Sequence, residues 1–182
     1  MRETILYIAS SLDAYIAREN GDVKWLEDFP NPDQTDYGYA EFLAGCDTLV
    51  MGSATYREVL SFGIEWPYAD KDVYVMSGNA AIHIQTPRTA RLAGVDDWLR
   101  VCNSLPENGK NCWLVGGGQL IRTFLQAGAL DRMHLTQFPV LLGSGIPLFP
   151  GTFPMQYWTT VRTQHYASGA LGMELVPRSL HI

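Results

Sequence analysis

The sequence predicts a single α/β domain of three layers, with helices on both faces of a mostly parallel mixed sheet and antiparallel strands at its C-terminal end. Short apolar runs alternate with helical patterns as far as Gly128, as is typical of parallel sheets covered by helices. After Gly128 the pattern is β-rich, which adds antiparallel strands at one edge. The 182 residues, 47% of them hydrophobic, suit one domain with a substantial core, spanning residues 1–182.

The expected parallel strands are short, nearly continuous apolar runs, which suit strands buried on both faces. These runs lie at 4–9, 48–51, 72–76 and 111–115. The irregular segment 80–94 has room for one more short strand. A strand at 132–142, interrupted by Pro139, and an antiparallel pair at 156–161 and 172–176 complete the expected sheet.

Helical patterns occupy the segments between these strands, at 36–44, 55–60, 96–105 and 119–127. Thr55 and Glu58 have the spacing of a capping box, and Asp96 or Asp97 is expected to cap the third helix. Gly128 follows the fourth helix as a C-terminal stop. The third helix carries a broad apolar stripe, made of Trp98, Leu99, Val101, Cys102 and Leu105.

Residues 10–29 lack periodicity and are expected to form a long loop. Loops of this length in compact domains are usually lids, binding loops or disordered segments. This one could close over a substrate and exclude water, with Trp25 as a substrate contact, or it could be a mobile surface loop. We interpret Asp13 as a carboxylate that braces the loop through hydrogen bonds.

Composition and charge argue against several classes of function. The net charge is −6 and no run rich in Lys or Arg occurs, so nucleic acid is not expected as a partner. The three cysteines and four histidines lack metal-ligand or disulfide spacing, so no metal site is expected. No apolar run of about 20 residues and no signal-peptide pattern occur, so we expect a cytoplasmic protein without a membrane span.

The strongest local signal is the glycine run Gly116–Gly118, which lies between a buried strand and a helix. Such a junction leaves main-chain N–H groups bare at a helix N-terminus, where a pyrophosphate can bind. The run is neither a GxGxxG fingerprint, because residue 121 is Ile, nor a P-loop. A plain tight turn is the alternative. The segment 51–55 repeats the order of strand, glycine and helix, and could flank the same ligand.

Asp36 and Glu41 lie on or beside the first expected helix, directly after the long loop. Either carboxyl group could donate or relay a proton if an apolar pocket raised its pKa. The alternative is a solvated or capping carboxylate, which is the commoner role of an acid at a helix N-terminus.

Five segments occur in an order that resembles a known family: 11–17 (SLDAYIA), 36–42 (DYGYAEF), 50–56 (VMGSATY), 113–119 (WLVGGGQ) and 139–149 (PVLLGSGIPLF). Together they resemble the reductase domain of riboflavin biosynthesis, the RibD C-terminal domain, and its stand-alone dihydrofolate-reductase-like relatives. The resemblance covers nearly the whole chain. It implies an eight-stranded mixed sheet, NADPH as the hydride donor, a small heterocyclic substrate and a homodimer.

The resemblance also implies roles for individual residues. Asp36 would lie near the substrate-binding acid and is the predicted catalytic residue. The predicted substrate contacts are Trp25, Tyr37 and Glu41. The predicted cofactor contacts are Ala9, Ile16 and Ala17 at the nicotinamide, Gly52, Ser53 and Thr55 along the phosphates, Ser77 at the adenosine ribose, and Gly116, Gly117, Gly118, Gln119 and Leu120 at the pyrophosphate.

Two departures from the family pattern affect these expectations. Relatives usually have Gly-Arg-Lys-Thr where residues 52–55 are Gly-Ser-Ala-Thr, and that arginine is the expected partner of the 2′-phosphate of NADPH. NADH is therefore open as the cofactor, unless Arg57, Arg88 or Arg91 substitutes. The deaminase motifs H-x-E and P-C-x-x-C do not occur, so deamination is not expected.

The sequence thus predicts an NAD(P)H-dependent reductase that transfers a hydride to a pterin- or ribosylaminopyrimidine-like heterocycle. The alternative is a dinucleotide-binding or regulatory module without turnover. A structural dimer component without any ligand is a third reading.

Overall fold

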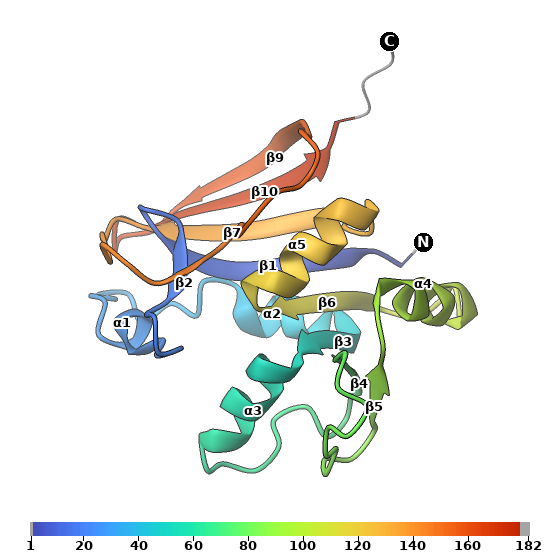
Figure 1. Ribbon diagram of the computed structural model, residues 1–182. Coiled ribbons are helices and arrows are strands. Elements are labelled where there is room, and N and C mark those ends of the chain that lie inside the picture. Colours follow the sequence, from blue (N-terminus) through green and yellow to red (C-terminus); the bar gives the residue numbers. More distant parts are fainter. Residues whose placement is uncertain (1, 179–182) are drawn as a thin grey trace.

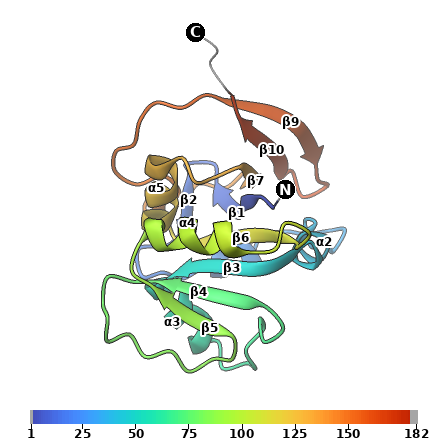
Figure 2. The ribbon, with the colours of Figure 1, turned by 90° about the vertical axis from the view of Figure 1, so that its right-hand side faces the viewer.

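The computed structural model describes residues 2–178. Its centre is an eight-stranded sheet in the order β5-β4-β3-β6-β1-β7-β10-β9 (Figure 1). Neighbours from β5 to β7 are parallel, whereas β10 pairs antiparallel with β7 and β9. The strands are β1 Thr4–Ser11, β3 Cys46–Gly52, β4 Asp72–Met76, β5 Thr89–Leu92, β6 Asn111–Gly116, β7 Arg132–Phe138, β9 Trp158–His165 and β10 Leu171–Pro177. This confirms the predicted mixed sheet, and Figure 2 shows β9 and β10 at the end farthest from β5.

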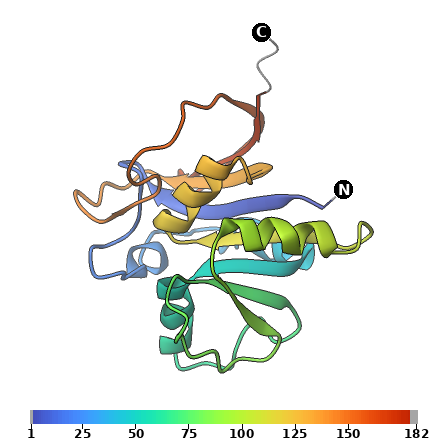
Figure 3. The ribbon, with the colours of Figure 1, turned by 45° about the vertical axis from the view of Figure 1, so that its right-hand side comes forward.

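Helices cover both faces of the sheet, as predicted. The helices α4 (Val95–Ser104) and α5 (Gly118–Ala127) lie on one face, in front of the strands in Figure 3. There Trp98 and Phe124 are fully buried among apolar residues of the sheet. The helices α2 (Tyr39–Ala44) and α3 (Ser53–Ser61) pack on the opposite face, where Tyr56 is buried. None of the helices within residues 2–178 is both long and apolar enough to cross a bilayer.

The segment 10–29 is more regular than the long loop that we expected. The strand β1 continues to Ser11, β2 (Tyr15–Ala17) pairs with β8 (Ile146–Pro147), and α1 covers Lys24–Glu27. The carboxylate of Asp13 accepts hydrogen bonds from the Ser11 hydroxyl and from the main-chain N–H groups of Leu142 and Gly143. The predicted bracing role of Asp13 is confirmed, and it ties this segment to one more than a hundred residues away.

Several helix starts differ from prediction, and each difference has a local cause. The helix α2 begins at Tyr39 because Tyr37 and Gly38 have positive φ angles of 56° and 88°, which are not helical. The helix α3 begins at Ser53, so Thr55 already lies inside it and the predicted capping box with Glu58 is wrong.

The predicted cap and stripe of α4 are also partly wrong. Gly94 is the N-cap residue, in place of Asp96 or Asp97. Asp97 lies within the helix and accepts a hydrogen bond from the N–H of Ala93. Leu99 is 39% exposed although we placed it on the apolar stripe, because the buried face of α4 centres on Trp98.

Candidate functional site

A cleft of about 860 Å³ opens along the carboxyl ends of the parallel strands. Its wall includes Ala9 of β1, Val115 of β6, Gly52 of β3 and Met76 of β4. Parallel strands bring their carboxyl ends to one edge of the sheet, which is where open α/β sheets bind ligands. The volume lies within the range of small-molecule and cofactor sites, roughly 300–1,000 Å³.

The helices α5 and α3 begin at the wall of this cleft, as does α4, whose N-cap residue Gly94 also lines it. The N-cap residue of α5 is Gly117 and that of α3 is Gly52, and neither helix has a side-chain hydrogen bond at its cap. The first N–H groups of a helix have no partner within the helix, and the helix dipole makes this end positive. Because Gly52, Ser53, Gly117 and Gly118 all line the cleft, both uncapped ends are available to a phosphate group.

The three consecutive glycines differ in their surroundings. Gly116 has φ of 115°, a conformation that favours glycine, and the Gly116–Gly117 peptide bond is cis. A Cβ atom on Gly118 would lie 2.5 Å from the carbonyl oxygen of Pro147. A Cβ atom on Gly117 would meet only ordinary neighbours, the nearest being the Thr55 hydroxyl at 3.7 Å. Gly118 is therefore needed for packing, whereas Gly117 presents bare main chain to the cleft.

The structure brings nearly all of the predicted cofactor residues to this one cleft. The members on its wall are Ala9, Ile16, Ala17, Gly52, Ser53, Thr55, Ser77, Gly117, Gly118, Gln119 and Leu120. Gly116 does not line it, because it is buried as the last residue of β6. Residues from five distant segments of the chain thus surround one volume.

Comparison with known proteins identifies the family. The family model for the RibD C-terminal domain matches residues 2–171. The protein belongs to this family. It is 37% identical over 150 residues to "Uncharacterized protein YwjB" of Bacillus subtilis (strain 168), covering 81% of this chain and 83% of that one. It is 30% identical to a solved structure named "Putative riboflavin biosynthesis protein" from Shewanella sp. PV-4, with a TM-score of 0.84 over 97% of this chain and 99% of that one.

The dihydrofolate-reductase-like fold of this RibD C-terminal domain is also shown by structure. A dihydrofolate reductase from Enterococcus faecalis, solved in complex with NADP(H) and RAB-propyl, superposes with a TM-score of 0.69 over 97% of each chain. Sequence identity is 15%, so this likeness concerns the fold alone.

An aromatic wall and a carboxylate complete the cleft of this RibD C-terminal domain, and the sequence did not single them out. Tyr39 packs against Trp113 with ring centroids 5.8 Å apart, and the Trp113 indole N–H donates to the carbonyl oxygen of Tyr7. Glu58 of α3 also lines the cleft, and within residues 2–178 its carboxylate has no hydrogen bond or ion pair. The spacing of Glu58 from Thr55 predicts a capping box, whereas the structure places Glu58 on the wall of the cleft.

The predicted catalytic residue Asp36 does not lie on the wall of the cleft. Its side chain is exposed, and its carboxylate oxygens accept hydrogen bonds from the main-chain N–H groups of Ala40 at 2.8 Å and Gly38 at 2.9 Å. These hydrogen bonds hold the pKa of Asp36 below its usual value. A proton donor needs a raised pKa, so the environment of Asp36 corresponds to the alternative reading, a carboxylate that caps α2.

The predicted substrate residues lie elsewhere as well. Trp25 is the buried residue of α1, and its ring packs edge-on against Phe138 with ring centroids 5.8 Å apart, so it is a core residue. Tyr37 and Glu41 line a second, smaller pocket of about 320 Å³ between α2 and the strands β7, β10 and β9. Tyr7 borders both cavities.

The smaller pocket has charged side chains on its wall. Arg162 donates to the carboxylate of Glu174 at 3.2 Å, and His134 lies beside the same carboxylate. Burial lowers the pKa of His134, so this imidazole is neutral at pH 7. The two cavities therefore differ in chemistry, because the larger one is built mainly from main chain and apolar side chains.

Proposed function

We propose that the protein is a reductase that transfers a hydride from a reduced nicotinamide dinucleotide to a planar nitrogen heterocycle of the pterin or ribosylaminopyrimidine kind. The observation that carries this proposal is the cleft at the carboxyl ends of the strands, into which two uncapped helix N-termini point. Membership of the RibD C-terminal domain family supports a reductase.

The pyrophosphate of the dinucleotide would lie between the N-termini of α5 and α3. The main-chain N–H groups at Gly117 and Gly118 would donate to it from one side and those at Ser53 from the other. The bound dinucleotide supplies a hydride at its nicotinamide ring. The apolar residues Ile16 and Ala17 would pack against that ring and keep water away from it.

The substrate would occupy the part of the cleft next to the nicotinamide. The rings of Tyr39 and Trp113 offer a planar heterocycle an apolar wall on which to stack. The unpartnered carboxylate of Glu58 would accept hydrogen bonds from ring N–H or amino groups and so orient the ring. Orientation of the accepting carbon toward the nicotinamide accounts for a large share of such a reaction's acceleration.

The experiment that tests this proposal is a substitution at the bare glycine, Gly117→Asp. We expect the wild-type protein to bind a reduced dinucleotide, with a stabilisation of about 2.7 kcal/mol in thermal unfolding at 100-fold Kd. The added carboxylate would occupy the pyrophosphate position and repel the charges of the phosphates. We expect it to raise Kd for the dinucleotide by roughly 100-fold or more. Thr160→Asp is the matched control, since it adds the same charge on the exposed strand β9.

Oxidation of the dinucleotide, followed at its nicotinamide absorbance over a panel of heterocycles, completes the test. An unchanged Kd in Gly117→Asp would refute the assigned site. Binding without hydride transfer to any heterocycle of the panel would favour the alternative prediction, a dinucleotide-binding module without turnover. The predicted homodimer stays a prediction.

A further inference from the structure

One side of the cleft is built from two very short strands that are far apart in the sequence. The strand β2 supplies Ile16 and Ala17 to the cleft wall, and β8 supplies Ile146. These strands have three and two residues, and they pair with each other outside the main sheet. Even a complete two-stranded hairpin is only marginally stable by itself, so a pair this short needs support from other contacts.

The Asp13 carboxylate provides such support, because it joins the turn before β2 to the segment before β8. It accepts hydrogen bonds from the N–H of Gly143 at 2.8 Å, from the N–H of Leu142 at 3.1 Å and from the Ser11 hydroxyl at 2.6 Å. These donors hold the pKa of Asp13 below its usual value, so the carboxylate is charged at neutral pH. Hydrogen bonds to an ionised carboxylate are roughly twice as strong as those between neutral groups.

The two segments also touch on both sides of β8. Gly145, directly before β8, lies so close to β2 that a Cβ atom there would overlap the carbonyl oxygen of Ala17. Directly after β8, the N–H of Leu148 donates to the carbonyl oxygen of Ala14 at 2.9 Å. A shift of the segment around β8 therefore also shifts the wall residue Ala17.

The segment around β8 packs on the start of α5 as well. A Cβ atom on Gly118 would meet both the carbonyl oxygen of Pro147 and the ring of Pro150, the latter at 3.1 Å. A Cβ atom on the preceding Gly117 would lie 4.0 Å from the Cδ1 atom of Ile16. This segment thus contacts the two parts of the cleft that the proposed function uses, the apolar wall for the nicotinamide and the helix N-terminus for the pyrophosphate.

We infer that Asp13 is a positioning residue of the proposed reductase. Asp13 is not on the wall of the cleft, so it acts through the segment 142–147. By fixing that segment against β2, it sets the place of Ile16 and Ala17 relative to the N-terminus of α5, and hence the place of the nicotinamide ring. This role rests on the proposed function. A misplacement of about 1 Å caused by a residue remote from the chemistry can slow a reaction by roughly 100-fold.

The test compares Asp13→Asn with a matched control, Asp47→Asn. An asparagine side chain keeps the size of aspartate, but one carboxylate oxygen becomes an NH2 group, which donates and cannot accept the main-chain N–H bonds. The carboxylate of Asp47 likewise accepts hydrogen bonds from a hydroxyl, that of Thr48 at 2.8 Å, and from a main-chain N–H, that of Lys110 at 2.9 Å. It lies at the opposite ends of the strands from the cleft.

The first measurement is hydrogen exchange of the main-chain amides by mass spectrometry, without any ligand. We expect the segments 14–18 and 142–148 to exchange roughly tenfold faster in Asp13→Asn than in the wild-type protein, because the bonds that close them are lost. In Asp47→Asn both segments should exchange at the wild-type rate. Unchanged exchange in Asp13→Asn would overturn the inference without reference to any dinucleotide.

The second measurement separates positioning from a purely structural role. We expect the single-turnover rate of hydride transfer in Asp13→Asn to fall by roughly tenfold. The Kd for the dinucleotide should rise by less than about threefold, because the pyrophosphate keeps its main-chain donors. In Asp47→Asn both quantities should equal those of the wild-type protein. A purely structural role predicts a loss of stability in Asp13→Asn with the rate unchanged.

Faster exchange with an unchanged rate of hydride transfer would therefore overturn the inference and leave the proposed function intact. Absence of dinucleotide binding by the wild-type protein would remove the proposed function, and the exchange data would still decide whether Asp13 fixes this wall of the cleft. If Asp13→Asn does not fold, Asp13→Ser, which keeps a hydroxyl as an acceptor, takes its place and should show both changes.

Discussion

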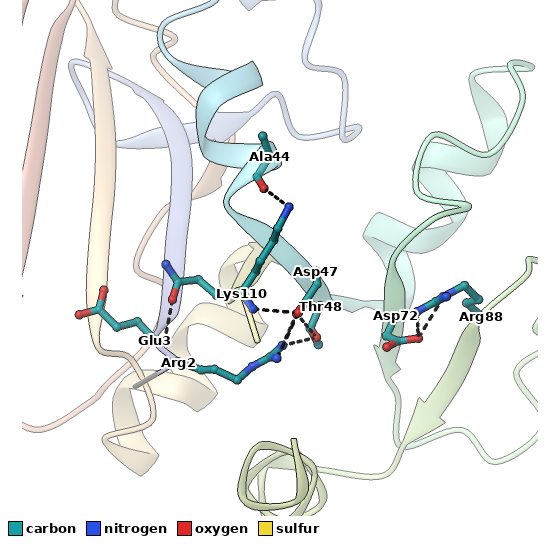
Figure 4. Close-up of polar contacts among 9 residues, drawn as sticks. Arg2, Glu3, Ala44, Asp47, Thr48, Asp72, Arg88 and Lys110 are labelled. Atoms are coloured by element: carbon teal, nitrogen blue, oxygen red, sulfur yellow. Dashed lines mark hydrogen bonds and ion pairs between the residues drawn. The ribbon is translucent and has the colours of Figure 1, made fainter. Parts of the chain in front are cut away.

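The two ends of the parallel strands are built in opposite ways. At the amino ends, charged side chains form ion pairs: Arg2 pairs with Asp47, and Arg88 pairs with Asp72 (Figure 4). At the carboxyl ends, glycines and apolar residues leave the sheet open as the large cleft. The same strands therefore carry ion pairs at one end and an open cleft at the other, and it is at the carboxyl ends that open α/β sheets usually bind ligands.

The difference follows from what each end needs. The Asp47 carboxylate accepts hydrogen bonds from the Arg2 guanidinium, the Thr48 hydroxyl and the N–H of Lys110, so it joins β3 to the segments before β1 and β6 (Figure 4). Pairs of this kind hold neighbouring strands together. A phosphate-binding end needs unpartnered donors instead, and in the proposed function the uncapped first turns of α5 and α3 provide them.

The largest effect on stability is expected from a substitution at the carboxyl end, Gly118→Ala. Its methyl group would lie 2.5 Å from the Pro147 carbonyl oxygen, so β8 must move. We expect a loss of about 2 kcal/mol in the free energy of unfolding, measured with urea. Gly117→Ala is the matched control and should change stability by less than about 0.5 kcal/mol. Equal stability of the two variants would contradict the division of roles between these glycines.

A smaller effect is expected at the amino end, from Asp47→Asn. The variant loses charge-assisted hydrogen bonds to Arg2 and Lys110, but the Asp47 side chain is 39% exposed and water screens part of the loss. We expect a destabilisation of about 1 kcal/mol at pH 7, with the Kd for the dinucleotide unchanged. A changed Kd would show that the two ends are coupled.

The pH dependence of this variant sharpens the same test. Burial acts to raise the pKa of Asp47, but its hydrogen bonds outweigh burial and the pKa is lowered. Stability from such a carboxylate is present above its unfolded pKa of about 3.9 and is lost as the pH falls through the lower folded pKa. The wild-type protein should therefore converge on Asp47→Asn in stability as the pH falls below about 4.

The smallest effect is expected from Arg88→Ala. The side chains of Arg88 and Asp72 are 53% and 46% exposed, so this ion pair is well solvated although two nitrogens of Arg88 contact the carboxylate. We expect less than about 0.5 kcal/mol of destabilisation in urea unfolding, and less still in 1 M salt. A loss above 1 kcal/mol would mean that the ion pair between Arg88 and Asp72 stabilises the amino end of the sheet as much as the hydrogen bonds of Asp47 do.

By itself, the sequence determined the architecture and the edge of the sheet at which the cleft opens. Alternating apolar runs and helical patterns predicted the sheet, and the two junctions of strand, glycine and helix at 52 and 116–118 predicted where main-chain amides would be bare. These features are local, since they depend on residues within a few positions of one another. Gly94, at a third such junction, could have been found by the same pattern.

The tertiary structure alone decided which side chains face the cleft. The start of α3 at Ser53 brings Glu58 to the wall, and the left-handed residues before α2 leave Asp36 as an exposed cap. The need for glycine at 118 comes from Pro147, about thirty residues away in the chain. Local propensity does not predict such long-range contacts, because they depend on how separate elements pack and not on the pattern within any one of them.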